Sequence, residues 1–188
     1  MLISISGAQG QGKTTVLNAL AERGYNVIPK KSSRSILIDW NMSLHDINKN
    51  HQLTLEFQEE IIARQKEKDS EILDSAIINF TERSYADIFS YALNILGAFN
   101  EYDDWMNDYY QRCKEQQQTY DCIIYLSGRS MYKPENDGVR SVNTQFAKMM
   151  DIVIRHYVDD FDNGNVLHVD TPEHNARISM ILERLKHI

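Results

Sequence analysis

The sequence predicts an α/β fold in which helices cover both faces of a five-stranded parallel sheet. Short apolar segments alternate with longer segments whose apolar residues recur every three or four positions, the pattern of strands joined by crossover helices. The chain has 188 residues, of which 42% are hydrophobic, and this suits a sizeable core. No linker, internal repeat or low-complexity segment interrupts it, so we expect a single domain over residues 1–188.

The first half of the chain supplies two predicted strands and two predicted helices. Residues 2–6, LISIS, are an apolar run that ends at a glycine and fits a buried parallel strand. A helix is expected over residues 14–23 and a second strand over 25–30. Periodicity is poor in residues 31–51, so we expect an irregular surface loop there. A workable apolar face among many charges predicts the next helix over about 54–72.

The second half continues the alternation and completes the sheet. Three more apolar runs fit strands at residues 75–80, 120–126 and 165–170, and helices are expected over 85–98 and 102–117. We interpret the aromatic residues of the second of these helices as packing residues: Tyr102, Trp105, Tyr109 and Tyr110. A further helix is predicted by one apolar face, formed by Phe146, Met149, Met150, Val153, Ile154 and Tyr157. We therefore expect the Met149-Met150 pair to belong to the core. We expect Thr171 to cap the last helix, with Pro172 at its first position.

Charge and cysteine content narrow the classes of function. The formal net charge of -7 makes general binding to a nucleic-acid backbone unfavourable, so small-molecule ligands are expected. The cysteines, Cys113 and Cys122, have no metal-ligand spacing, which favours free thiols in a reducing compartment. No segment approaches the ~18 apolar residues of a membrane span, and the first residues lack the pattern of a signal peptide. We therefore expect a cytoplasmic protein that does not bind membranes.

A phosphate-binding loop is predicted between the first strand and the first helix. Its residues fit the pattern G-x-x-x-x-G-K-[ST] and the position that follows it: Gly7, Ala8, Gln9, Gly10, Gln11, Gly12, Lys13, Thr14 and Thr15. The glycines allow successive N–H groups to point inward, and the helix N-terminus adds positive potential. We expect Lys13 to reach the outer phosphates of a nucleotide and Thr14 to bind Mg²⁺ through its hydroxyl. A glycine-rich turn without function is the alternative, but it needs no Lys-Thr pair.

Two charged residues follow the third predicted strand, at the sheet edge where ligands bind in parallel sheets. Glu82 can accept a hydrogen bond from an attacking hydroxyl or hold a metal-bound water, and Arg83 can hold a phosphate with two parallel bonds. We interpret both as catalytic candidates, against the alternative of a solvated ion pair. Arg34 follows the second strand in a locally basic segment, and we expect it to contact the acceptor.

A basic loop is predicted after the fourth strand. Residues 128–143 combine turn residues and charges without periodicity, and their cations are Arg129, Lys133 and Arg140. A closing basic loop can bring cations to a phosphoryl group and exclude water, which favours transfer to a second substrate over hydrolysis. On this hypothesis the segment is a lid, in which Arg129 contacts the nucleotide and Arg140 is catalytic. An ordinary charged surface loop is the alternative.

Four segments resemble a known family: residues 7–15, FQEEIIARQ at 57–65, TERSYADIFSY at 81–91 and YKPENDGVRSVN at 132–143. Together they resemble the AAA-type P-loop ATPase and kinase family that includes the ribosylnicotinamide kinase domain of NadR and small phage-encoded nucleoside or nucleotide kinases. The resemblance implies a nucleotide-kinase-like three-layer sandwich, ATP with Mg²⁺, and a mobile lid that carries Arg140. It also implies that Gln58 and Asp87 lie near the acceptor. Members usually end the third strand with Asp-Arg, which corresponds to Glu82-Arg83.

The leading hypothesis is ATP- and Mg²⁺-dependent phosphoryl transfer to a nucleoside, a nucleotide or a related small metabolite. Glu82 would act either as the base or as the ligand of a metal-bound water. One alternative is a nucleotide-dependent regulatory ATPase or binding protein, and another is a kinase that acts on a modified base in DNA, which the acidic charge disfavours. The acceptor, the donor base and a homodimeric state stay open. A phage origin would place the protein in the host cytoplasm.

Overall fold

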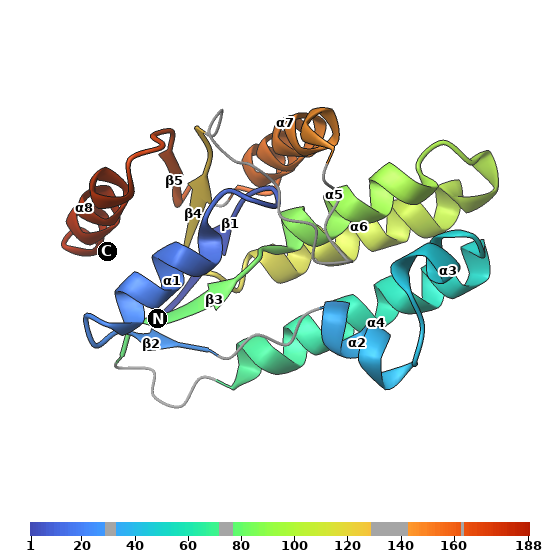
Figure 1. The fold of residues 1–188 in the computed structure, drawn as a ribbon, viewed down its shortest axis with the longest axis horizontal. Helices are drawn as coiled ribbons and strands as arrows, with labels where there is room; N and C mark the ends of the chain where they lie inside the picture. Colours follow the sequence, from blue (N-terminus) through green and yellow to red (C-terminus); the bar gives the residue numbers. More distant parts are fainter. Residues whose placement is uncertain (29–32, 72–76, 129–142, 163) are drawn as a thin grey trace.

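The computed structural model describes residues 1–28, 33–71, 77–128, 143–162 and 164–188. Its sheet contains five parallel strands in the order β2-β3-β1-β4-β5, which confirms the predicted fold class (Figure 1). The strands are β1 (Leu2–Ser6), β2 (Asn26–Val27), β3 (Asn79–Glu82), β4 (Cys122–Leu126) and β5 (Val166–Val169). The strand order reverses beside β1, so ligands are expected in the crevice at its carboxyl end.

Helices cover both faces of this sheet. They are α1 (Lys13–Ala21), α2 (Ser33–Asp39), α3 (Leu44–Asn48), α4 (His51–Ser70), α5 (Tyr85–Leu96), α6 (Asp103–Gln117), α7 (Thr144–Asp160) and α8 (His174–Leu185), with a 3₁₀ turn at Asn100–Tyr102. One face carries α1 and α8, and the other carries α5, α6 and α7 (Figure 1). Side chains of β1 alternate between the two cores: Leu2 packs on the α5 side, whereas Ile3 and Ile5 pack on the α1 side.

A third, smaller core joins α2, α3 and α4 at the side of the molecule away from α8 (Figure 1). Ile36 and Leu37 of α2 and Ile47 of α3 pack there with Phe57 of α4. The expectation of an irregular loop over residues 31–51 is therefore wrong for α2 and α3. With 7 and 5 residues, these helices are too short to show a clear apolar period. A usable signal was the capping box of Ser43 with Asp46, which begins α3.

Most element boundaries differ from prediction by a few residues, and two of the differences concern residues discussed above. β3 covers Asn79–Glu82 instead of residues 75–80, so Glu82 is the last residue of the strand. The last helix begins at His174 with Glu173 at its N-cap, so the prediction of a Thr171 cap with Pro172 as the first helical residue is wrong. Thr171 Oγ1 instead accepts a hydrogen bond from the Glu173 N–H at 3.3 Å, in the turn before the helix.

Side-chain burial confirms most of the predicted helix faces. Met150 is fully buried, but Met149 is 42% exposed, so the expectation that both belong to the core is wrong for Met149. It lies one position off the buried stripe, whose members are four residues apart. Trp105 stacks on Tyr109 with ring centroids 4.5 Å apart, as expected of packing aromatics. Within the described ranges, no helix combines the length and the apolar character needed to cross a bilayer.

Candidate active site

The predicted phosphate loop lies between β1 and α1. Gly7, Gly10 and Gly12 have φ angles of 138°, 82° and 79°, values that favour glycine. A Cβ atom on Gly7 would also lie 2.5 Å from the carbonyl oxygen of Leu126, so no larger residue fits there. α1 starts directly after Gly12, which is its N-cap. The loop therefore brings a helix N-terminus to the carboxyl end of β1, the arrangement that binds phosphate.

Lys13 folds back over this loop. Its Nζ donates hydrogen bonds to the carbonyl oxygens of Gly7 at 2.6 Å and Ala8 at 2.9 Å. Lys13 is buried, whereas Thr14 and Thr15 are exposed on the first turn of α1, and all three line one pocket. Lys13 and Thr14 thus line the same pocket, while their expected contacts with phosphates and Mg²⁺ stay predictions.

Asp87 anchors the loop from the α5 side. It is fully buried and forms a capping box with Ser84 at the start of α5. Its carboxylate accepts hydrogen bonds from Ser6 Oγ at 2.5 Å and from the Gly7 N–H at 3.2 Å. The family resemblance implies that Asp87 lies near the acceptor, but in this structure Asp87 does not line the pocket. Its oxygens already bind donors of the protein interior, which makes it a support of the phosphate loop.

Arg177 of α8 holds the loop from the other face, a role that the sequence pattern does not predict. Its Nη1 donates to the carbonyl oxygen of Gln11 at 2.5 Å, and its Nη2 to that of Ser127 at 2.8 Å. Its Nε donates to the carbonyl oxygen of Thr171 at 2.6 Å. One guanidinium therefore joins the phosphate loop to the segments that follow β4 and β5. The available signal in the sequence is that Arg177, a charged residue, directly precedes Ile178, which belongs to the buried stripe of the helix.

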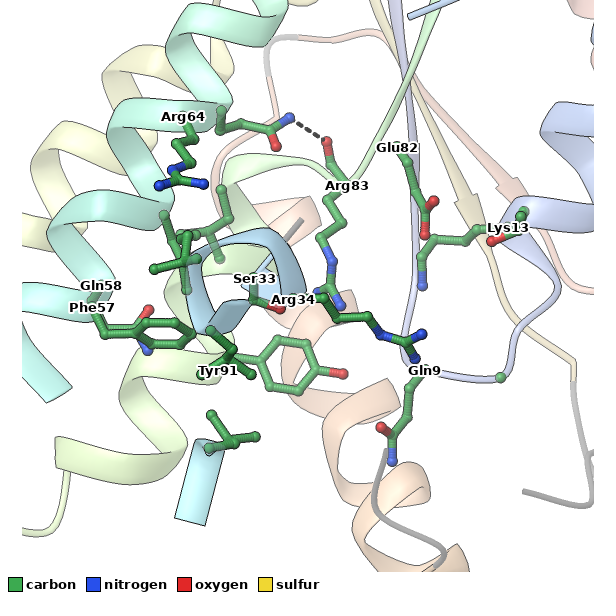
Figure 2. A pocket seen from close by; sticks show the side chains of 18 of the residues that line it. Gln9, Lys13, Ser33, Arg34, Phe57, Gln58, Arg64, Glu82, Arg83 and Tyr91 are labelled. Atoms are coloured by element: carbon green, nitrogen blue, oxygen red, sulfur yellow. Dashed lines mark hydrogen bonds between the residues drawn. The ribbon is translucent and has the colours of Figure 1, made fainter. Parts of the chain in front are cut away.

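Glu82 and Arg83 end β3 beside the phosphate loop. Parallel pairing places Glu82 opposite Ile5 of β1, and the Arg83 N–H donates to the Ile5 carbonyl oxygen at 3.0 Å. Glu82 is 8% exposed and lines the same pocket as Lys13. Figure 2 shows its carboxylate turned toward the Lys13 side chain. The register of two strands thus brings together the two charges that the sequence analysis singled out.

Arg83 has an unusual backbone conformation and a fixed side chain. Its φ is 75°, a left-handed value that is strained for a residue with a Cβ. Its guanidinium carbon lies 5.1 Å from the centre of the Tyr91 ring, in a cation–π contact. Burial acts to lower the pKa of Arg83, but Tyr91, Asp87 and Glu82 together raise it above its ordinary value. Arg83 therefore keeps a positive charge in the pocket.

A pocket of ≈ 380 Å³ connects the phosphate loop with the groups at the end of β3 (Figure 2). Its far side is apolar and is formed by Ile36, Leu37, Leu44, Phe57, Ile61, Ile88 and Ile95. Gln58 lines it too; this residue is 2% exposed, and its Oε1 accepts no hydrogen bond from the part of the chain that the structure describes. An apolar chamber with a few polar groups is the usual form of a small-molecule site.

Two arginines from α2 and α4 complete the polar lining. Arg34 lines the pocket, and its expected contact with the acceptor stays a prediction. Arg64, which the sequence analysis did not single out, lines it as well, and its guanidinium contacts Asp39 at 2.7 Å and Glu60 at 2.6 Å. These carboxylates, chiefly Glu60 through its hydrogen bond, raise the pKa of Arg64. The charge of Arg64 is thus balanced within the protein.

Arg129 and Arg140, with nearly all of the predicted lid, lie outside the described residues, so their roles stay predictions. The Thr14 hydroxyl and the Glu82 carboxylate supply oxygen ligands of the kind that Mg²⁺ accepts. Among the residues that the structure describes, no group of three or more His, Cys, Asp or Glu is placed to hold a metal ion. These donors therefore suit a metal that is held jointly by the protein, water and nucleotide phosphates.

The phosphate loop and the five-stranded parallel sheet together define a P-loop protein with a nucleotide-kinase-like fold. A family model described as an AAA domain matches residues 2–177, so the chain belongs to this family. A comparison with curated proteins gives no significant match.

Solved structures with a similar fold include three informative cases. NadR in complex with NR has a TM-score of 0.66 at 14% identity, over 97% of this chain and 50% of the NadR chain. Deoxyadenosine kinase from M. mycoides with bound dATP has a TM-score of 0.64 at 16% identity, over 99% of this chain and 100% of the kinase. Thymidylate kinase from Ehrlichia chaffeensis has a TM-score of 0.60 at 15% identity, over 98% of both chains. At these identities the likeness shows the fold; this chain spans half the length of NadR.

Proposed function

We propose that the protein is an ATP- and Mg²⁺-dependent phosphotransferase that phosphorylates a nucleoside, a nucleotide or a related small metabolite. One observation carries the proposal: Lys13 of the phosphate loop and the Glu82-Arg83 pair line the same ≈ 380 Å³ pocket as an apolar chamber. A volume of this size holds a small molecule. A nucleotide switch that transfers phosphate only to water has no need of such a chamber.

The donor side is the loop that runs from Gly7 to Thr15. ATP phosphates bind to its backbone N–H groups and the N-terminus of α1, and the Lys13 ammonium turns from the loop carbonyls to the outer phosphates. When bound, Mg²⁺ would neutralise charge on the phosphates; the Thr14 hydroxyl would hold it, and Glu82 would hold it directly or through a water. Arg129 contacts the nucleotide from the lid.

Transfer takes place between this loop and the end of β3. For a hydroxyl acceptor, Glu82 takes the proton while the acceptor oxygen bonds to the γ-phosphorus and the bond from that phosphorus to ADP breaks. Arg83, and Arg140 from the lid, stabilise the negative charge of the moving phosphoryl group. A nucleotide acceptor attacks with a phosphate oxygen that is already ionised, so no proton has to be removed, and Glu82 would then serve to hold Mg²⁺.

The acceptor side suits a flat heterocycle with a polar edge. Phe57, Leu37 and Ile95 provide apolar walls, and the buried Gln58 amide offers both a donor and an acceptor. Arg34 can bind a phosphate or sugar oxygen at the side near the loop. The structural likeness to a deoxyadenosine kinase and a thymidylate kinase supports an acceptor of the nucleoside class.

The test is transfer of labelled phosphate from ATP, with Mg²⁺, to a panel of nucleosides, nucleotides, ribosylnicotinamide and DNA. We expect label on one small molecule and no transfer by the Lys13→Ala variant. Release of phosphate to water, unchanged by every acceptor, would contradict the proposal and favour a regulatory ATPase. Label in DNA, lost steeply as salt is added, would identify a base in DNA as the acceptor.

A second variant tests the lid. Arg140→Ala is expected to leave ATP binding largely intact and to lower the rate of transfer, because the arginine acts on the moving phosphoryl group. Equal losses of ATP binding and transfer would contradict this role.

A further inference from the structure

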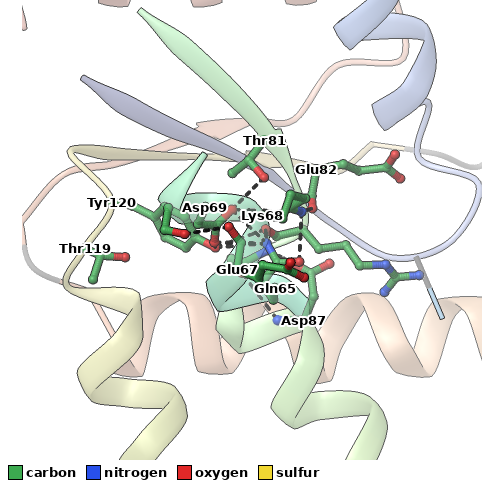
Figure 3. Close-up of polar contacts among 12 residues, drawn as sticks. Gln65, Glu67, Lys68, Asp69, Thr81, Glu82, Asp87, Thr119 and Tyr120 are labelled. Carbon is green, nitrogen blue, oxygen red and sulfur yellow. Dashed lines mark hydrogen bonds and ion pairs between the residues drawn. The ribbon is translucent and has the colours of Figure 1, made fainter. Parts of the chain in front are cut away.

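A cluster of buried polar residues lies next to the Glu82-Arg83 pair, between α4, β3 and Tyr120, which is two residues before β4 (Figure 3). Lys68 and Asp69, at the end of α4, are 1% and 6% exposed. Gln65 and Tyr120 are buried beside them. Lysine and aspartate are seldom this buried unless partners satisfy them, so their contacts show what the cluster holds in place.

Lys68 links the cluster to β3. Its Nζ donates hydrogen bonds to Gln65 Oε1 and to the main-chain carbonyl oxygen of Glu82, both at 2.8 Å. Its ammonium lies 4.0 Å from Asp69 Oδ1, so the two buried charges compensate each other. Asp69 in turn accepts hydrogen bonds from Thr81 Oγ1 at 2.9 Å and from the Tyr120 hydroxyl at 2.7 Å.

Gln65 holds the next carbonyl along the chain, that of Arg83, and Tyr120 lies beside it. Gln65 Nε2 donates to the carbonyl oxygen of Arg83 at 3.1 Å, and the Tyr120 hydroxyl lies 3.4 Å from the same oxygen. The cluster therefore fixes the peptide groups on both sides of the Arg83 Cα. This is the residue with the strained φ of 75°, and such a conformation persists only where the surroundings over-determine it.

We propose that Lys68, Gln65 and Tyr120, tied together by Asp69, are positioning residues that set the Glu82 carboxylate and the Arg83 guanidinium for phosphoryl transfer. The inference rests on the proposed function, because it assigns a role within that reaction. The cluster holds the carbonyl groups of Glu82 and Arg83, and their side chains point away from it into the pocket. If the carbonyls were released, Arg83 would relax to an ordinary φ, and its side chain would leave its place over Tyr91.

Helix α4 joins the cluster to the acceptor side of the pocket. The same helix carries Gln58 and Arg64 into the acceptor side of the pocket. One rigid element thus connects the groups that contact the acceptor with the groups that hold Glu82 and Arg83. The acceptor and the catalytic pair are therefore placed relative to each other by the length of a single helix, between Gln58 and Lys68.

The kinetic test uses residues of the cluster that do not line the pocket. Lys68→Met removes the donor to the Glu82 carbonyl, and Tyr120→Phe removes one hydroxyl while keeping the ring. We expect kcat to fall roughly 10- to 100-fold for Lys68→Met, since small misplacement of catalytic groups costs this much. Tyr120→Phe should show a smaller loss. The KM for ATP should change by less than about twofold in both, because the phosphate loop is untouched.

Thr54→Val is the matched control. The Thr54 hydroxyl is also buried and donates to a main-chain carbonyl, that of Ile47, at 3.0 Å, and neither residue lines the pocket. Its removal is expected to lower thermal stability as Tyr120→Phe does, while kcat stays the same. A cluster with a purely structural role would give the same unchanged kcat for all of these variants at a temperature where they are folded, and that result would overturn the inference. A rise in the KM for ATP equal to the fall in kcat would overturn it too.

A crystal structure of the variants separates this inference from the proposed function. The double variant Lys68→Met with Asp69→Asn leaves no unpaired buried charge. It can therefore replace Lys68→Met in the test if the single variant does not fold. We expect Arg83 to leave its left-handed φ in either variant. If the wild-type protein phosphorylates no acceptor, the proposed function fails. The backbone conformation of Arg83 in the variants then still tests whether the cluster holds this residue in place. A variant with Arg83 unmoved would contradict the inference whatever the activity.

Discussion

The Asp87 carboxylate accepts the main-chain N–H of Gly7 at 3.2 Å, a contact between the first turn of α5 and the first residue of the phosphate loop. The same carboxylate accepts hydrogen bonds from Ser6 and Ser84. All of these partners are donors, so a side chain with two acceptor oxygens satisfies them. A residue that the family resemblance assigns to the acceptor is thus part of the support beneath the loop.

Asp87→Asn tests this support. The NH₂ group of the amide would face the N–H and O–H groups of Gly7 and Ser84 and could not accept their hydrogen bonds. We expect a loss of about 1 to 3 kcal/mol in the free energy of unfolding. ATP binding should weaken as well, because the start of the loop is no longer fixed. Asp46→Asn, at the exposed capping box of α3, is the control: it should cost less stability and leave ATP affinity unchanged. Denaturant unfolding and calorimetric ATP titration measure both effects; equal effects of the two variants would argue against a special role for Asp87.

Arg177→Met tests the support from the other face of the sheet. The variant leaves the carbonyl oxygens of Gln11, Ser127 and Thr171 without this donor. We expect ATP affinity to fall by about tenfold, the equivalent of one or two charge-assisted hydrogen bonds. Arg184→Met, on the same helix, removes a bond to Asn165 far from the loop and should leave ATP affinity unchanged. An Arg177→Met protein that binds ATP normally would show that the loop is fixed without α8.

Gly7→Ala separates steric conflict from backbone strain. Gly7 and Gly24 both have positive φ, but a Cβ at Gly7 meets the Leu126 carbonyl oxygen, whereas a Cβ at Gly24 has nothing within 4 Å. Gly24→Ala should therefore cost only the left-handed conformation, about 1 to 2 kcal/mol. Gly7→Ala should cost more and abolish ATP binding. Similar unfolding midpoints for the two variants would mean that β1 and β4 can separate at this point.

The link between Glu59 and Arg112 gives a pH-dependent prediction. Hydrogen bonds from Arg112, at 2.7 Å, are the main reason why the pKa of Glu59 lies below its ordinary 4.5. A lowered pKa contributes stability that is present above pH 4.5 and is lost as the pH falls through the folded-state pKa. Because both side chains are partly exposed, the contribution is less than about 1 kcal/mol.

The Glu59→Gln variant is therefore expected to be slightly less stable than the wild type at neutral pH, with the difference vanishing in acid. Urea unfolding at several pH values measures it. Glu56→Gln, on the exposed face of α4, serves as the control and should show no such difference. A stability gap for Glu59→Gln that stays constant into acid would contradict the assignment.

Much of the fold and part of the site could be predicted from the sequence. The features that could be predicted depend on local sequence, and those that could not depend on contacts between distant segments. The phosphate loop is local: the spacing of Gly7, Gly12 and Lys13 encodes a backbone turn, and strand and helix periods around it are equally local. Glu82 was placed correctly because parallel strands all end at one edge of the sheet. The sequence pattern does not predict residues that act through contacts with distant segments of the chain. Asp87 and Arg177 reach the loop from α5 and α8, and Lys68 reaches Glu82 from the end of α4.

Phosphorus NMR of the γ-phosphate of ATP, with Mg²⁺ and the acceptor identified in the panel, distinguishes transfer from hydrolysis. We expect a new phosphoester or diphosphate resonance that grows in step with ADP, and a rate roughly 100-fold or more lower for Glu82→Gln, since a general base of this kind contributes that much. ADP that appears only together with inorganic phosphate, at a rate that the acceptor does not change, would contradict this expectation.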